Sequence, residues 1–251
     1  MTRARYLFVH AHPDDETLDT GAVLLAMREQ GVPAYVLTAT RGEQGEVVPG
    51  TLDRYRSGAE LTQAREAELR AAVAVLGVPG HAFLGTPPAR APGRQPRDYQ
   101  DSGMRWVTPT VAGPSGEAGP QALTSAPLAE VVDDIAAYAT AVAATDLVSY
   151  DADGGYGHPD HVLLHQATRA AAQQLGLPFW VIVAEPGEQV QWYDSEGHRS
   201  SLEAAHHTYA TQLTLDAGTV THVGGQQQPL RLAAGLRRFP PPTSSNTSDE
   251  G

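Results

Sequence analysis

The sequence predicts an α/β fold of the Rossmann-like type, in which a mostly parallel sheet is flanked by helices. The first observation is that short apolar runs alternate with amphipathic segments, which is typical of strands that are each followed by a helix. The second is that histidines and aspartates cluster directly after two of the apolar runs. In an open parallel sheet those positions are the carboxyl ends of strands, where ligands bind. We therefore expect one catalytic cleft at that edge of the sheet.

The individual elements follow from the hydrophobic periodicity. The expected strands are 6–9, 34–40, 81–84, 147–150 and 179–183. The expected helices are 16–30, 60–76, 128–144 and about 161–175. Gly31, Gly77 and Gly176 stand where three of these helices should end, because glycine readily adopts the left-handed conformation that closes a helix.

The alternation covers only part of the chain. Residues 1–184 should form the Rossmann-like catalytic domain, with a long insertion at 85–127 that is dense in proline and glycine. A loop of this length within a compact domain is usually a functional lid or a mobile insertion. Residues 185–239 lack the alternation, and we expect a small C-terminal mixed subdomain there. The composition of 240–251, proline followed by serine, threonine and acidic residues, predicts a disordered tail.

Composition excludes several classes of protein. The chain has 251 residues and a formal net charge of -12 at pH 7. This acidic balance, with basic residues that are scattered along the chain, argues against binding to nucleic acid or to an anionic membrane. No run of about 18 apolar residues and no cleavable leader segment is found, so we expect a cytoplasmic protein. The sequence leaves a homo-oligomer possible.

The first cluster of reactive residues follows the first expected strand. His12 and Asp15 lie three residues apart in a tight turn, where Pro13 restricts one backbone angle. An imidazole and a carboxylate can therefore converge on one point, while Asp14 between them must point elsewhere. Since the chain has no cysteine, any metal has to be held by imidazole and carboxylate groups.

The second cluster, residues 154–161, follows the expected strand 147–150 and contains Tyr156, His158 and His161. Two loops at the same edge of a parallel sheet would bring these groups into one cleft with the first cluster. This donor set fits a catalytic zinc site, which has three protein ligands and an open position for water. Spacing alone leaves open whether His158 or His161 is the ligand.

These clusters resemble a known family. Residues 12–16, His-Pro-Asp-Asp-Glu, and 158–161, His-Pro-Asp-His, are similar to the signature pair of the LmbE-like, PIG-L-type zinc N-deacetylases. Within that superfamily, residues 99–104 and 151–161 most resemble the deacetylase of mycothiol biosynthesis, which removes acetate from an N-acetylglucosaminyl inositol. The similarity extends over about residues 5–184, and more weakly over 202–215.

The resemblance implies roles for the residues that match the motifs. It makes His12, Asp15 and His161 the ligands of a zinc ion, for which Fe²⁺ is a possible substitute in the cell. The metal would polarise an amide carbonyl and lower the pKa of water to about 7. Asp14, a carboxylate beside the metal but not on it, is then the natural general base.

The remaining roles concern the substrate and the oxyanion that forms when water attacks the carbonyl. The resemblance makes His158 an electrostatic catalyst, acting as a protonated imidazole, and Asp101 the residue that hydrogen-bonds it. Tyr156 would contact the reacting carbonyl. Arg65 would bind sugar or inositol hydroxyls, or else form an ordinary ion pair with Glu68 on the same helix.

The sequence thus predicts zinc-dependent hydrolysis of the acetamide of a small N-acetylglucosamine conjugate. The rivals within the superfamily are a thiol-conjugate amidase, which typically has proline where Gly157 stands, and an N-acetylglucosaminyl-malate deacetylase. A non-catalytic metal-binding relative is a further alternative. A dinucleotide-binding domain is disfavoured because the first strand does not lead into a glycine-rich turn. The chain is also shorter than expected of the mycothiol enzyme, chiefly in its C-terminal part.

The sequence assigns less specific roles to the other polar residues of these motifs. Asp160 is expected to be structural and to cap the helix that follows it. The other histidines lack partners at metal-ligand spacing or have no match in the family pattern, and we expect them to be structural or exposed. They are His10, His81, His165, His198, His206, His207 and His222.

Overall fold

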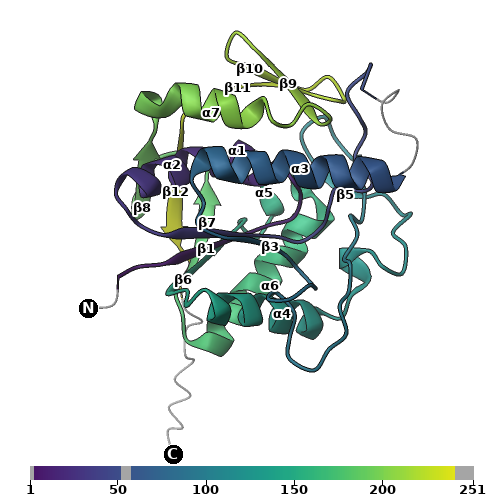
Figure 1. Cartoon of the computed structure of the whole chain (residues 1–251), viewed down its shortest axis with the longest axis vertical. Coiled ribbons are helices and arrows are strands. Elements are labelled where there is room, and N and C mark those ends of the chain that lie inside the picture. The colour runs from purple at the N-terminus through teal and green to yellow at the C-terminus, as the bar shows by residue number, and fades with distance from the viewer. Residues whose placement is uncertain (1–2, 52–57, 241–251) are drawn as a thin grey trace, which may run out of the picture.

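The computed structural model describes residues 3–51 and 58–240. Its centre is a seven-stranded sheet with helices on both faces (Figure 1). Five strands are mutually parallel, and two further strands extend one edge, each pairing antiparallel with its neighbour. In spatial order the strands are β3 (His81–Phe83), β2 (Ala34–Thr38), β1 (Tyr6–His10), β6 (Asp146–Ser149), β7 (Phe179–Val183), β12 (Ala233–Arg238) and β8 (Val190–Asp194). The predicted α/β class and its five parallel strands are confirmed.

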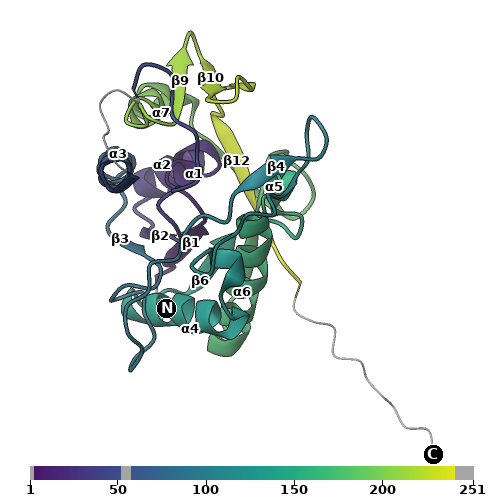
Figure 2. The same ribbon diagram turned by 90° about the vertical axis from the view of Figure 1, so that its right-hand side faces the viewer.

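Two helical layers cover the sheet, as Figure 2 shows from the side. One layer holds α4 (Leu128–Ala141) and α6 (Pro159–Leu175), and the other α2 (Gly21–Glu29), α3 (Gly58–Leu76) and α7 (Arg199–His206). Strand β1 is buried along its whole length. Because side chains alternate across a strand, Leu7 and Val9 belong to the first layer's core, and Tyr6 and Phe8 to the second.

The order of the parallel strands decides where the site lies. From β1 the chain moves outward to β2 and β3, and it then returns to the other side of β1 with β6 and β7. The strand order therefore reverses between β1 and β6, and such a switch point opens a crevice at the carboxyl ends of the two strands. Both predicted clusters of reactive residues begin at these strand ends.

The first helix differs from the prediction, because the expected helix 16–30 is two helices, α1 (Asp15–Leu18) and α2. The break falls at Thr20, whose hydroxyl donates to the Glu16 carbonyl at 2.9 Å and lies 3.0 Å from His10 Nε2. A threonine that bonds the carbonyl four residues back commonly bends a helix. Gly21, just after the break, admits α7, since a Cβ there would lie 2.6 Å from Leu202.

The long insertion 85–127 contains regular structure. It carries the hairpin of β4 (Met104–Trp106) and β5 (Ala112–Pro114) and a 3₁₀ turn at Leu123–Ser125. Strand β5 contacts α5 (Gly154–Gly157), the short helix that leads into the second cluster (Figure 2). The insertion therefore lies beside the second cluster of reactive residues.

The strands of the C-terminal part belong to two different sheets. Strands β8 and β12 join the main sheet, whereas β9 (Leu213–Asp216), β10 (Thr219–His222) and β11 (Gln227–Pro229) form a separate antiparallel sheet. The expected domain boundary at 184 stays a prediction, but the main sheet continues across it. The expected disordered tail lies outside the described residues from 241 onward. Among the helices of the described chain, none combines the length and apolar character that a membrane crossing requires.

Candidate active site

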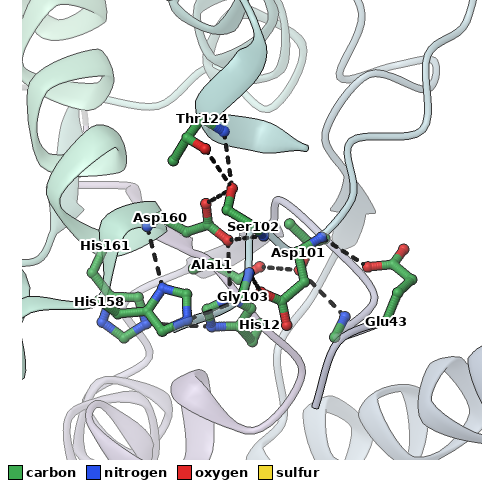
Figure 3. Close-up of polar contacts among 12 residues, drawn as sticks. Ala11, His12, Glu43, Asp101, Ser102, Gly103, Thr124, His158, Asp160 and His161 are labelled. Atoms are coloured by element: carbon green, nitrogen blue, oxygen red, sulfur yellow. Dashed lines mark hydrogen bonds and ion pairs between the residues drawn. The ribbon is translucent and has the colours of Figure 1, made fainter. Parts of the chain in front are cut away.

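The loops that follow β1 and β6 meet at the switch point of the sheet. His12 comes from the first loop, and His158 and His161 come from the start of α6. Figure 3 shows the three imidazoles gathered on one side of a cluster of carboxylates. Residues far apart in the sequence therefore share one buried site, as the two strand ends predicted.

Three donor atoms form a small triangle. The distances are 3.3 Å between His12 Nδ1 and His161 Nε2, 3.4 Å between His12 Nδ1 and Asp15 Oδ2, and 3.5 Å between His161 Nε2 and Asp15 Oδ2. Tetrahedral zinc with bonds of about 2.1 Å places its ligand atoms about 3.4 Å apart. The two imidazoles and the carboxylate of this triangle are thus spaced as a zinc site requires.

His158 is a second imidazole within reach of the same point. Donor atoms of His12, His158 and His161 lie within 4.8 Å of one another. The triangle that contains Asp15 is tighter, and His158 Nδ1 already accepts the Asp160 backbone N–H at 3.2 Å. The set of donor atoms that contains Asp15 is therefore the more compact of the two.

The local backbone explains how Asp14 and Asp15 diverge. The His12 backbone N–H donates to Asp15 Oδ2 at 2.8 Å, which closes the turn over Pro13. Asp14 has a φ of 109°, a left-handed value that aspartate tolerates better than most residues. Among the described residues the Asp14 carboxylate has no hydrogen-bond partner. Burial, followed by the charge of Asp15, raises its pKa well above the ordinary value.

His158 caps the helix that carries His161. Because its Nδ1 accepts a hydrogen bond, the proton of the neutral imidazole resides on Nε2. Burial, together with the nearby His12 and His161, lowers the pKa of His158 to about 3. These surroundings favour a neutral N–H donor over the protonated imidazole that the sequence suggested.

Asp101 lies between two imidazoles. Its Oδ1 is 3.6 Å from His12 Nε2 and 3.9 Å from His158 Nε2, both beyond hydrogen-bond length. The expected hydrogen bond from Asp101 to His158 is therefore not formed here. Although burial opposes its ionisation, the charge of His12, with a smaller effect of His158, holds the pKa of Asp101 well below its usual range.

The contacts of Asp160 differ from those expected of a helix cap. Its Oδ2 lies 3.3 Å from His12 Nε2, and its oxygens accept the Ser102 hydroxyl at 2.5 Å and the Ser102 N–H at 3.0 Å. Ser102 Oγ is in turn bonded by Thr124 (Figure 3). The prediction that Asp160 caps α6 was wrong, since His158 is the cap. Asp160 is instead a fully buried carboxylate that orients His12, a common arrangement at metal sites.

Tyr156 lies at the mouth of the site. Its ring centroid is 5.2 Å from that of His161 and 6.2 Å from that of His158. On its other side Trp106 of the β4–β5 hairpin lies 5.8 Å away. Both aromatic side chains are partly exposed, at 38% and 42%, so Tyr156 is accessible to a ligand that enters the cleft.

Arg65, on α3, is buried under the loop that follows β2. Its Nη2 donates to the Gly45 and Glu46 carbonyls at 3.0 and 2.9 Å, whereas Nε and Nη1 have no partner among the described residues. Glu68 binds Thr211 instead, so the alternative ion pair is absent from the hydrogen bonds and salt bridges of the described chain. A Cβ at Gly45 would lie 2.8 Å from Nη1, which explains the glycine.

Most of the other histidines have structural contacts. His81 Nε2 lies 3.0 Å from Thr38 Oγ1, and His165 and His206 each direct Nδ1 at a backbone carbonyl. His10 contacts Thr20, and His198 and His222 pair near the surface with Glu29 and Gln228. These contacts agree with the structural roles expected of them.

The family model described as PIG-L, GlcNAc-PI de-N-acetylase, matches residues 7–172. The chain belongs to this family. The matched segment contains both histidine-aspartate clusters and the strands that position them. The resemblance drawn from the sequence motifs is therefore confirmed.

Comparisons with individual proteins agree with this membership. The chain is 43% identical over 164 residues to a 1D-myo-inositol 2-acetamido-2-deoxy-alpha-D-glucopyranoside deacetylase of Kineococcus radiotolerans. The alignment covers 65% of this chain but only 43% of that relative, so the chain spans less than half of the relative's length.

Solved structures share the fold at lower sequence identity. A deacetylase of teicoplanin biosynthesis, in complex with teicoplanin, is 18% identical with a TM-score of 0.59, covering 94% of this chain and 99% of that one. A 4-carboxy-2-hydroxymuconate hydratase of Pseudomonas putida gives the same TM-score and identity, covering 97% and 99%. Because a hydratase and a deacetylase share this architecture, the fold alone does not decide the reaction.

Proposed function

We propose that this chain is a zinc-dependent N-deacetylase that hydrolyses the acetamide of a small N-acetylglucosamine conjugate. The observation that carries the proposal is the triangle of His12, Asp15 and His161 donors, 3.3–3.5 Å apart, with the unpaired carboxylate of Asp14 beside it. Family membership and the name of the Kineococcus relative support the reaction type.

His12, Asp15 and His161 would hold the metal, zinc or alternatively Fe²⁺. When bound, the metal supplies Lewis acidity that polarises the amide carbonyl and lowers the pKa of a water molecule to about 7. The donor set of two imidazoles and one carboxylate suits zinc, and it leaves a position open for the reactants.

Asp14 would act as the general base. It accepts a proton from the attacking water while the water oxygen bonds to the carbonyl carbon, and it then transfers that proton to the nitrogen as the C–N bond breaks. The products are acetate and a free amine. Among the described residues the Asp14 carboxylate has no hydrogen-bond partner, so its oxygens are free to accept this proton.

His158 and Tyr156 would stabilise the negative charge that develops on the carbonyl oxygen. The His158 Nε2–H is fixed in direction because Nδ1 is engaged by the backbone of α6. The ring of Tyr156, which lies next to the imidazoles of His158 and His161, would bring its hydroxyl to the same oxygen. Prearranged donors of this kind cost little reorganisation during the reaction. Asp101, between His12 and His158, would keep both imidazoles oriented.

Arg65 would bind hydroxyl groups of the substrate. Two of its nitrogens are buried without a partner among the described residues, and unsatisfied donors of this kind are costly unless a ligand completes them. Its place beneath the loop that follows β2, on the same rim as the metal triangle, suits a sugar or cyclitol next to the acetamide.

The direct test is release of free amine by the zinc-loaded protein. The panel contains N-acetylglucosaminyl inositol, N-acetylglucosaminyl malate, N-acetylglucosamine and a mycothiol conjugate. We expect turnover of an N-acetylglucosamine conjugate well above that of the free sugar. Preferential cleavage of the mycothiol conjugate would instead identify a thiol-conjugate amidase. No turnover of any member with zinc bound would mean that the metal site is right while the substrate class, or catalysis itself, is wrong.

A further inference from the structure

Tyr150 links the two loops of the site through contacts with Asp15 and His161. It is the first residue after β6, and its side chain is almost fully buried, with 3% exposed. Its hydroxyl accepts the Ala11 backbone N–H at 2.7 Å and donates to Asp15 Oδ2 at 2.7 Å. A tyrosine hydroxyl has one hydrogen. Because Ala11 can only donate, that hydrogen is directed at Asp15.

The ring of Tyr150 contacts a second member of the triangle. It is stacked on the imidazole of His161, with ring centroids 3.9 Å apart and planes 9° from parallel. His161 itself is buried, and its Nδ1 faces the Gly154 carbonyl at 3.3 Å. The stacked ring therefore restricts rotation of the imidazole about its axis while Nε2 points at Asp15 and His12.

We infer that Tyr150 is a positioning residue of the metal centre, which holds the Asp15 carboxylate through its hydroxyl and the His161 imidazole through its ring. This inference rests on the proposed metal site. Groups that orient metal ligands in this way commonly contribute 10–100-fold to metal affinity, roughly speaking, because they remove the entropy cost of aligning the ligands. Tyr150 contacts two of the three ligands and the loop of the third.

The chain offers a matched control in Tyr209. This tyrosine is also fully buried, and its hydroxyl donates to Glu16 Oε1 at 2.6 Å. Tyr209→Phe therefore removes the same oxygen atom from the same kind of bond, one residue beyond the ligand Asp15. The two variants differ in whether the carboxylate that loses its donor belongs to the proposed metal triangle, and Tyr150→Phe also leaves the Ala11 N–H without its acceptor.

The experiment measures the zinc affinity of metal-stripped protein by competition with a chromogenic chelator. We expect Tyr150→Phe to bind zinc roughly 10–100-fold more weakly, and Tyr209→Phe to stay close to wild type. Tyr150→Leu, which loses the stacked ring as well, should bind more weakly than Tyr150→Phe. Circular dichroism of each metal-free variant checks that the fold is retained.

Four outcomes separate the possibilities. Wild-type zinc affinity in both Tyr150 variants would overturn the inference, and so would an equal loss in Tyr209→Phe. Because no substrate is used, the positioning role stands if zinc binds as expected but no amide is cleaved, in which case only the proposed reaction fails. If the wild-type protein binds no zinc, both proposals fall.

Discussion

The tripeptide His-Pro-Asp occurs twice in this site, and its residues have opposite tasks in the two places. At 12–14 the histidine belongs to the triangle of donor atoms, and the aspartate carboxylate has no hydrogen-bond partner within residues 3–51 and 58–240. At 158–160 the histidine caps a helix, and the aspartate is fully buried and bonded to Ser102. Identical sequence therefore yields an aspartate that is proposed to be catalytic in one loop and a hydrogen-bonded, buried aspartate in the other.

The element that follows each tripeptide accounts for the difference. Pro159 is the first residue of a 17-residue helix, so Asp160 is held in its first turn and directed inward. Asp14 precedes a helix of only four residues and adopts a φ of 109°, which turns its side chain out of that helical path. What a motif does thus depends on the backbone it enters.

The largest effect should come from substituting, one at a time, the two histidines that are candidates for the same ligand position. His161→Gln removes a donor of the triangle and should abolish stoichiometric zinc binding and all turnover. His158→Gln should keep zinc and lower turnover by roughly 10²–10³, as loss of an oxyanion donor does. Metal analysis of the purified variants and amine release check both. Zinc loss in His158→Gln with zinc retained in His161→Gln would reverse the assignment.

The next effect tests the catalytic aspartate. Asp14→Asn should lose about 10²–10⁴ in turnover, because the amide cannot accept the proton of water. Its zinc content should match wild type, since Asp14 is outside the triangle. Measured metal content and amine release from one preparation decide this. If zinc and activity fall in parallel, Asp14 is a ligand and not the base.

A smaller effect tests the supporting aspartate. Asp160→Asn should weaken zinc binding about 10–100-fold, because His12 loses the carboxylate that orients it. Activity at saturating zinc should then recover much of the wild-type rate, unlike that of Asp14→Asn. Titration of activity against free zinc makes the comparison. The same irrecoverable loss in both variants would show that the two aspartates are not divided in this way.

The smallest effect concerns His81, which lies outside both tripeptides and serves as a reference for burial alone. Burial, followed by the charges of Arg70 and Arg41, lowers the pKa of His81 to about 4 from its ordinary 6.5. As the pH falls, His81 therefore takes up a proton in the unfolded chain before it does so in the folded chain. The contribution of His81 to the free energy of unfolding is fully present above pH 6.5 and is lost as the pH falls toward 4. Between pH 7.5 and 5.5 the loss is about 1 kcal/mol.

Urea unfolding of His81→Asn at the two pH values checks this. The variant cannot titrate in this range, so its free energy of unfolding should change by about 1 kcal/mol less than that of wild type. Metal is removed from both proteins beforehand, so that protonation of the site histidines affects the two equally. An unchanged pH dependence would mean that His81 does not carry the shift.

Much of the fold and of the donor set could be predicted from the sequence. The five parallel strands follow from apolar runs, and His12, Asp15 and His161 follow from their places at strand ends and from the family motifs. The hydrophobic periodicity of the sequence did not predict β8 and β12, because buried and exposed residues do not alternate regularly along these strands. The periodicity also predicted one helix where the structure has α1 and α2, because the break at Thr20 depends on a contact with His10.

The sequence by itself determined the five parallel strands, the strand ends at which the reactive residues gather and the residue types that are available there. These properties depend on residues within one or two helical turns, which a local pattern reports. Only the tertiary structure decided which residues hold the donor side chains in place. Asp160, which is bonded by Ser102, contacts His12, and Tyr150 contacts Asp15. These partners are separated by as many as 148 residues, and no local pattern specifies how the strands and helices that carry them pack together.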